Sequence, residues 1–156
     1  MSRKAKQAFF GASMRAGNER ASLEQLDLIK AAIRELDIEI ISDHQTKPGI
    51  IAEENKLQPC EVRDRELRRI KDSDLAIFEV SDPSHGVGVL ISDAVQMGKP
   101  VVCLYDIKVP ELEISAVVRG MERSVYTGSP FACFAYGDPR DAAIIVDEFL
   151  VVNLLR

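Results

Sequence analysis

Short apolar runs alternate along the chain with longer segments in which apolar residues recur every three or four positions. The helical spacing is clearest at Leu26, Ile29 and Ile33. The apolar runs lie at residues 7–11, 38–42, 75–80, 100–105 and 131–136. This alternation is typical of βα units that stack into a parallel sheet. We therefore predict one α/β domain over residues 1–156, an open five-stranded parallel sheet with helices on both faces.

Capping residues mark where several of the predicted helices begin. Ser22 and Gln25 have the spacing of a capping box, which predicts the start of the first helix. Asp138 followed by Pro139 predicts the start of the last helix in the same way. Further helices are expected at residues 62–71, from the loop 81–88 to Gly98, and at 113–121, with a loop around Pro48 and Gly49.

The last predicted helix is apolar on nearly all sides. Its apolar residues include Ile144, Ile145, Val146, Phe149, Leu150, Val151 and Val152. A helix of this kind has to be covered on two sides. Two explanations stay open, because either the sheet and a neighbouring helix of the same chain cover it, or one side forms a homodimer surface.

Two polar loops follow the first and third predicted strands. With the strand order 2-1-3-4-5, these loops flank the point where the order reverses, and ligands of open parallel sheets bind there. The second loop contains Ser84, Gly86 and Gly88 and leads directly into a helix. Glycines let an anion approach the backbone, and a helix start offers free N–H groups. The local residues indicate a phosphate site, although a plain turn from strand to helix explains them equally well.

Composition and charge exclude several classes of protein. Hydrophobic residues make up 46% and charged residues 29% of the chain, as in an ordinary globular domain. With 20 basic and 25 acidic residues, the net charge of -5 disfavours nucleic acid as a partner. No apolar stretch reaches the ~18 residues of a membrane helix, and the apolar run near the N-terminus is too short for a signal peptide. We expect a soluble, cytoplasmic protein without a membrane partner.

The three cysteines, Cys60, Cys103 and Cys133, carry no recognisable metal or redox pattern. Their number is odd, and none of them forms a CxxC or a Cys/His spacing. We therefore expect reduced thiols, no metal and no other cofactor.

Several segments in the same order resemble a known family. They are GASMRAGN after the first strand, SDH after the second, SDLAIFEVSDPSHGVG, KPVVCLY and ISAVVRG, and together they span most of the chain. In these segments the sequence resembles the deoxynucleoside 5'-monophosphate N-glycosidases of the Rcl type, which belong to the nucleoside 2-deoxyribosyltransferase superfamily. The resemblance implies a flavodoxin-like, Rossmann-like domain that forms a homodimer and cleaves the bond between base and sugar in a nucleoside 5'-monophosphate.

The resemblance also implies roles for individual residues. It assigns the 5'-phosphate to Ser84, Gly86 and Gly88 with help from Ser13 and Arg15, and it brings Ser115 in from the partner subunit. It places Phe9, His44 and Leu90 on the side of the base and sugar. His85 lies within the phosphate loop, where an imidazole can contact an anion.

The chain departs from the family at chemically important positions. Leu90 stands where the resemblance expects the nucleophilic glutamate of a retaining glycosidase. Glu66 replaces an aspartate, and Phe9 replaces a tyrosine. The remaining carboxylate candidates are Glu66, as a general base on water, and Asp93, one helical turn beyond Leu90.

Three hypotheses about function therefore stay open. In the first, the chain is an N-glycosidase or deoxyribosyltransferase with an altered catalytic set. In the second, it is a nucleotide-binding or sensor protein without catalysis. In the third, it is a Rossmann-like domain whose pocket serves another sugar phosphate or a partner. Turnover of a nucleoside monophosphate separates the first two.

Overall fold

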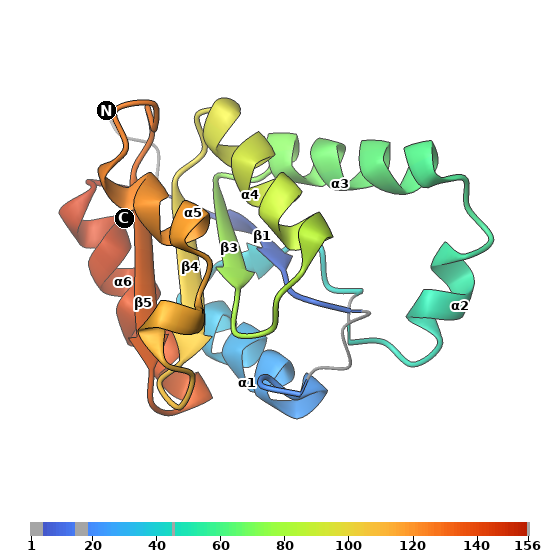
Figure 1. The fold of residues 1–156 in the computed structure, drawn as a ribbon, viewed down its shortest axis with the longest axis horizontal. Helices are drawn as coiled ribbons and strands as arrows, with labels where there is room; N and C mark the ends of the chain where they lie inside the picture. The colour runs from blue at the N-terminus through green and yellow to red at the C-terminus, as the bar shows by residue number, and fades with distance from the viewer. Residues whose placement is uncertain (1–4, 15–18, 45, 156) are drawn as a thin grey trace.

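The computed structural model describes residues 5–14, 19–44 and 46–155. Its strands form one five-stranded sheet in the order β2-β1-β3-β4-β5, and every neighbouring pair is parallel (Figure 1). The strands are β1 (Gln7–Gly11), β2 (Glu39–Ile40), β3 (Leu75–Glu79), β4 (Val101–Asp106) and β5 (Phe131–Tyr136). The predicted fold class and strand order are confirmed.

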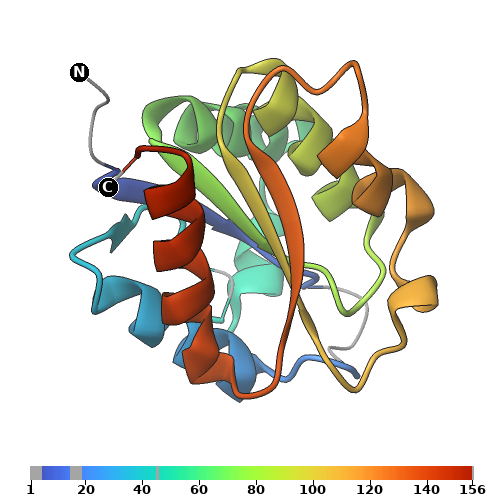
Figure 2. The ribbon, with the colours of Figure 1, turned by 90° about the vertical axis from the view of Figure 1, so that its left-hand side faces the viewer.

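Helices cover both faces of this sheet (Figure 2). One face carries α1 (Leu23–Arg34) and α6 (Ala142–Val152), and the other carries α3 (Pro59–Asp72), α4 (His85–Gln96) and α5 (Ala116–Gly120). The short helix α2 (Ile50–Glu54) lies away from the sheet, near the N-terminal end of α3 (Figure 1). No helix in the described part of the chain is long and apolar enough to cross a membrane.

Alternate residues of β1 belong to two separate hydrophobic cores. Ala8 and Phe10 pack with α1 and α6, whereas Phe9 packs on the opposite face beside α3 and α4. The ring of Phe9 lies 5.6 Å from that of Phe78, measured between centroids. Because both faces of the strand are buried, its apolar residues run continuously instead of alternating with polar ones.

The predicted start of the first helix is confirmed, and that of the last helix is displaced by one short turn. Ser22 Oγ accepts a hydrogen bond from the Gln25 N–H (3.2 Å), and Gln25 Oε1 accepts one from the Ser22 N–H (2.9 Å). Asp138 caps a short 3₁₀ turn, Pro139–Asp141, and α6 continues from it at Ala142.

The segment before β5 differs from its prediction. Instead of one helix over residues 113–121, the structure has a 3₁₀ turn at Glu111–Glu113, the short helix α5, and a second 3₁₀ turn at Met121–Arg123. The physical reason is the side chain of Ser115, which accepts a hydrogen bond from the Val118 N–H (3.4 Å) and so starts a helix of its own. Helix α2 was also missed, since Pro48 and Gly49 indicated only a loop.

The last helix is covered by its own chain on one side only. Val146, Phe149 and Leu150 are buried in the core shared with α1. Ile144 and Val152 are exposed by 60% and 79%. The explanation in which this chain covers α6 on both sides is therefore wrong.

Candidate functional site

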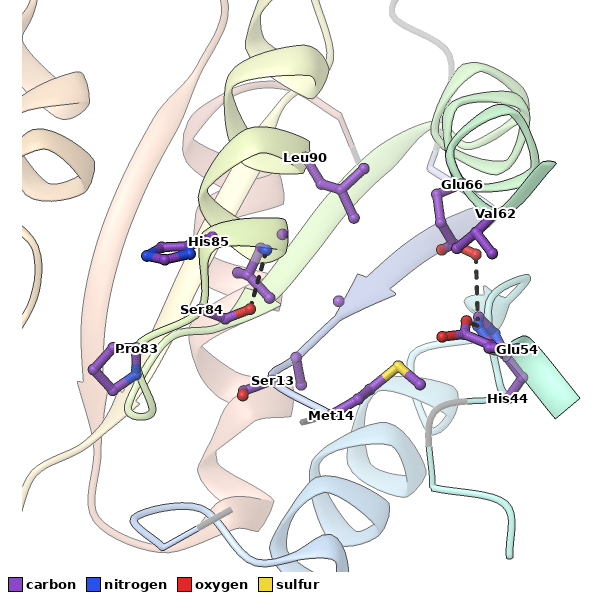
Figure 3. Close-up of a pocket in the computed structure, with 14 residues that line it drawn as sticks. Ser13, Met14, His44, Glu54, Val62, Glu66, Pro83, Ser84, His85 and Leu90 are labelled. Carbon is purple, nitrogen blue, oxygen red and sulfur yellow. Dashed lines mark hydrogen bonds and ion pairs between the residues drawn. The ribbon is translucent and has the colours of Figure 1, made fainter. Parts of the chain in front are cut away.

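A cavity of about 510 Å³ opens between the carboxyl ends of β1 and β3. Its size lies in the range of small-molecule sites, and its position is the predicted crevice where the strand order reverses. The described residues that line it are Gly11, Ala12, Ser13, Met14, His44, Glu54, Val62, Glu66, Pro83, Ser84, His85, Gly86, Val87 and Leu90. Figure 3 shows Pro83, Ser84 and His85 at one end of the cavity and His44, Glu54 and Glu66 at the other.

The first end, which we call the loop end, consists of residues 83–87 at the start of α4. Ser84 is the N-cap of this helix, and its Oγ accepts a hydrogen bond from the Val87 N–H (3.3 Å). The amides of His85 and Gly86 precede the first backbone bond of the helix, from the Gly88 N–H to the Ser84 carbonyl (3.1 Å). These amides and the helix dipole suit an anion, and the Ser84 hydroxyl can still donate its own hydrogen to a ligand.

The two glycines of the loop are not required by packing. A Cβ atom added at Gly86 would meet only the Ser84 hydroxyl at 3.9 Å, and one added at Gly88 would meet nothing within 4 Å. A glycine in a helix is less stable than alanine by about 0.5–1 kcal/mol, so its presence here needs another reason. Open space above the backbone at Gly86, which lines the cavity, lets a ligand reach the amides; Gly88 lies in α4 outside the lining.

Asp82, next to the loop end, faces away from the anion position. Its carboxylate accepts hydrogen bonds from the backbone N–H groups of Ala21 (2.9 Å) and Arg20 (3.2 Å). This carboxylate therefore ties the loop after β3 to the start of α1.

The floor of the cavity is formed by the end of β1. Gly11 lies there against the core, and a Cβ atom at this position would approach the Phe78 ring to 2.7 Å and the Phe9 ring to 3.0 Å. Only a residue without a side chain fits. Ser13, which is buried, follows on the same floor.

The opposite end, which we call the charged cluster, consists of His44, Glu54, Arg65, Glu66 and Arg69. Glu66 Oε1 accepts hydrogen bonds from Arg65 Nε (2.8 Å) and Arg69 (3.0 Å), and it lies 3.5 Å from His44 Nε2. The same Arg65 guanidinium donates to Glu54. Both carboxylates are buried, and two guanidinium groups balance their charges.

The pKa of His44 in this cluster lies below its ordinary value. Burial lowers its pKa, and the nearby guanidinium groups of Arg69 and Arg65 act in the same direction against the two carboxylates. Arg69 lies 2.9 Å from Nδ1, and Arg65 lies 3.3 Å from Nε2.

The cluster includes a set of groups that could hold a metal ion. The ligand atoms of His44, Glu54 and Glu66 lie within 4.8 Å of one another. Arg65 and Arg69, however, already donate to the same carboxylate oxygens. A divalent cation would have to displace two guanidinium groups, so the arrangement fits an ion-pair network better than a metal site.

The structure separates the two candidates on α4. Leu90 lines the cavity, half-buried, between the loop end and the charged cluster (Figure 3). Asp93 does not line it and instead forms a two-pronged ion pair with Arg63 (3.0 and 3.3 Å).

Other predicted site residues lie elsewhere. Phe9 is fully buried in the core and does not line the cavity. Ser115 is exposed at the start of α5, also away from the lining. Arg15 falls outside the described residues.

Sequence reasoning missed Glu54, Met14 and Val62 on the cavity wall. Glu54 belongs to a short polar stretch with no periodic pattern, so only the position of α2 reveals it. Val62 had a usable signal, because it lies one helical turn before Glu66 and so shares its face.

A further buried carboxylate lies at the end of β3, just before the loop that leads into α4. Glu79, the last residue of β3, accepts hydrogen bonds from the Ser81 hydroxyl (2.5 Å), the Ser81 N–H (3.1 Å) and the Tyr136 hydroxyl (3.0 Å). Burial raises its pKa to about 7 despite these donors. Its charge therefore changes near neutral pH, outside the cavity itself.

Comparison with known proteins places the chain in a family. A protein of Methanosarcina mazei named a 2'-deoxynucleoside 5'-phosphate N-hydrolase is 35% identical over 115 residues, which cover 74% of this chain and 68% of that protein. The chain belongs to this N-hydrolase family. A family member from Syntrophotalea carbinolica is 32% identical over 140 residues, covering 90% and 84%. The resemblance to the Rcl type is thereby confirmed.

A solved structure supports the fold of this N-hydrolase family member. The Clostridium botulinum CMP N-glycosidase superposes with a TM-score of 0.61 at 21% identity, covering 92% of this chain and 99% of that one. No protein-family model matches the chain.

Proposed function

We propose that the chain binds a nucleoside or deoxynucleoside 5'-monophosphate in the cavity between β1 and β3. The observation that carries this proposal is the cavity's two unlike ends, one with free helix amides beside Ser84 and one with buried carboxylates. The loop end suits the phosphate, and the space between the ends suits the sugar. The names of the relatives support a nucleotide of this class.

We further propose that any hydrolysis of the N-glycosidic bond proceeds by direct attack of water. Leu90 occupies the wall where the family resemblance expects a nucleophile, and a leucine cannot form a covalent intermediate. Glu66 is the carboxylate that lines the cavity and can act as a general base. Native activity is then weak or absent, and phosphate binding persists without it.

The second candidate is a nucleotide-binding or sensor protein without catalysis. The same apolar side chain of Leu90 favours it, because it removes the covalent route while the loop end stays complete. Binding is common to both candidates, and turnover distinguishes them.

Two measurements on the same protein test these candidates. A thermal-shift screen of nucleoside monophosphates reports binding, since a ligand at 100 times its Kd stabilises the fold by about 2.7 kcal/mol. Chromatography of released base reports turnover. Absence of any response at millimolar concentration would refute nucleotide binding and favour another sugar phosphate. Slow release abolished by Glu66→Gln supports the enzyme, and binding without release supports the sensor.

We also propose that the chain acts as a homodimer in the cytoplasm, with Ser115 reaching the neighbouring subunit's phosphate. The segment around Ser115 exposes large apolar side chains, namely Ile107, Leu112, Val117, Val125 and Tyr126. Exposed apolar side chains gathered into a patch mark interaction surfaces, and this segment offers five of them. Sedimentation at micromolar concentration tests the dimer, and a species of 17.3 kDa would refute it together with the role of Ser115.

A further inference from the structure

We propose that Glu54 and Arg65 are positioning residues that keep one oxygen of Glu66 available to the ligand. The inference rests on the proposed function, because it assumes that Glu66 faces a nucleotide. It adds a role for the short helix α2, whose last residue is Glu54.

Glu54 is buried for a reason other than apolar packing. It is 8% exposed, and it is the buried residue of α2, where Ile51, Ala52 and Glu53 are exposed. A buried carboxylate is stable only with a charged or hydrogen-bonding partner. Arg65 of α3 is such a partner, so this ion pair links α2 to the cavity wall.

The contacts to Glu66 all converge on one of its two oxygens. Arg65 Nε, Arg69 and His44 each approach Oε1, at 2.8, 3.0 and 3.5 Å. Among the described residues, none donates to Oε2. The second oxygen is thus available to a sugar hydroxyl or a water molecule in the cavity.

The arrangement of Arg65 explains this asymmetry. A guanidinium beside a lone carboxylate prefers to bind both oxygens with two parallel N–H groups. Here Nη2 of Arg65 donates to Glu54 while Nε donates to Glu66, so the Nε/Nη2 pair is divided between two carboxylates. Without Glu54, both Nε and Nη2 of Arg65 would donate to Glu66, and Oε2 would be occupied.

The test is a double-mutant cycle read by ligand affinity. NMR titrations with inorganic phosphate and with a panel of the four common deoxynucleoside monophosphates and CMP compare native protein, Glu54→Gln, Arg65→Gln and the double variant. We expect Glu54→Gln to weaken nucleotide binding about tenfold when Arg65 is present. In the Arg65→Gln background, the same change should alter affinity by less than about twofold.

Inorganic phosphate and a neighbouring residue provide the controls. We expect phosphate to occupy only the loop end, so its affinity should be the same in every variant. An unchanged phosphate affinity also shows that each variant is folded. Glu53→Gln removes the same charge from an exposed position on the same helix and should change nothing.

Three outcomes would overturn the inference. Equal losses in both backgrounds would mean that Glu54 does not act through Arg65, and unchanged nucleotide affinity in Glu54→Gln would mean that it does not act at all. If native protein binds phosphate but no nucleotide, the proposed function fails first and this inference fails with it.

Discussion

The two ends of the cavity hold their ligand-facing groups in different ways. The loop end presents backbone amides at the start of α4, with one hydroxyl from Ser84. The charged cluster depends entirely on side chains, and each of its carboxylates is balanced by a guanidinium from α3. Most substitutions leave the backbone N–H groups in place, whereas replacing one charged side chain rearranges the hydrogen bonds of the whole charged cluster. A single substitution is therefore expected to disturb the charged cluster more than the loop end.

The largest expected effect is a gain of activity near the charged cluster. Leu90→Glu places a carboxylate on the cavity wall between the two ends, and we expect release of free base from a deoxynucleoside monophosphate to rise at least a hundredfold. Chromatography of the released base measures it. The gain should grow with pH, because burial beside a phosphate favours the protonated form of a new carboxylate.

Glu66→Gln combined with Leu90→Glu tests whether the new activity depends on the Glu66 carboxylate. We expect it to remove most of the new activity. Fast release by native protein that survives Glu66→Gln would instead show that the catalytic carboxylate lies elsewhere, with Asp93 the next candidate.

The next effect is a pH dependence of stability that arises from Glu79. Because burial raises the pKa of Glu79 from 4.5 to about 7, the folded state holds this proton more tightly than the unfolded chain. The resulting stability is full below about pH 4.5 and is lost as the pH rises through 7. We expect the native protein to lose about 3 kcal/mol of unfolding free energy relative to Glu79→Gln between these limits. Denaturant melts of both proteins at several pH values measure it, and parallel curves would contradict it.

A smaller effect is expected at Ser84 itself. Ser84→Ala removes a hydroxyl that can donate to a phosphate, a bond to a charged group worth about 1.5–3 kcal/mol. Calorimetry should show equal loss for inorganic phosphate and for nucleotides, in contrast to the cluster variants. A loss confined to nucleotides would mean that the phosphate lies elsewhere.

The smallest effect is expected at Asp93. Its carboxylate pairs with Arg63 outside the cavity lining, so Asp93→Asn should change nucleotide affinity and base release by less than about twofold. The assays above measure both quantities. A loss of more than tenfold would transfer the role of catalytic carboxylate to Asp93.

Sequence patterns predicted the sheet and the helix start after β3, for a physical reason. β1 and β3 are buried on both faces, and the loop end depends on local features, namely a capping serine, glycines and the helix that follows. Each of these features is visible as a pattern of residues that are close together in the sequence. The crevice followed from strand order alone.

The charged cluster could not be predicted in the same way. Its members come from the turn after β2, from α2 and from α3, and only the packing of α2 near α3 joins Glu54 to Arg65. Glu66 and His44 were found through the family resemblance, while Glu54 had no local signal. Phe9, which the resemblance places on the base side, is buried in the core of the structure.

The contact of Gly11 with Phe78 and Phe9 limits how this scaffold can acquire new ligands. Any side chain at position 11 would press on two aromatic rings of the core. The depth of the cavity is therefore set by Phe78, the partner of Gly11 across the β1–β3 pair, and by Phe9. A designer or a diverging lineage can alter the walls at Met14, Val62 or Leu90 with little disturbance of the interior. Substitutions at the walls can therefore change the width of the cavity, whereas its depth is fixed by the packing of the core.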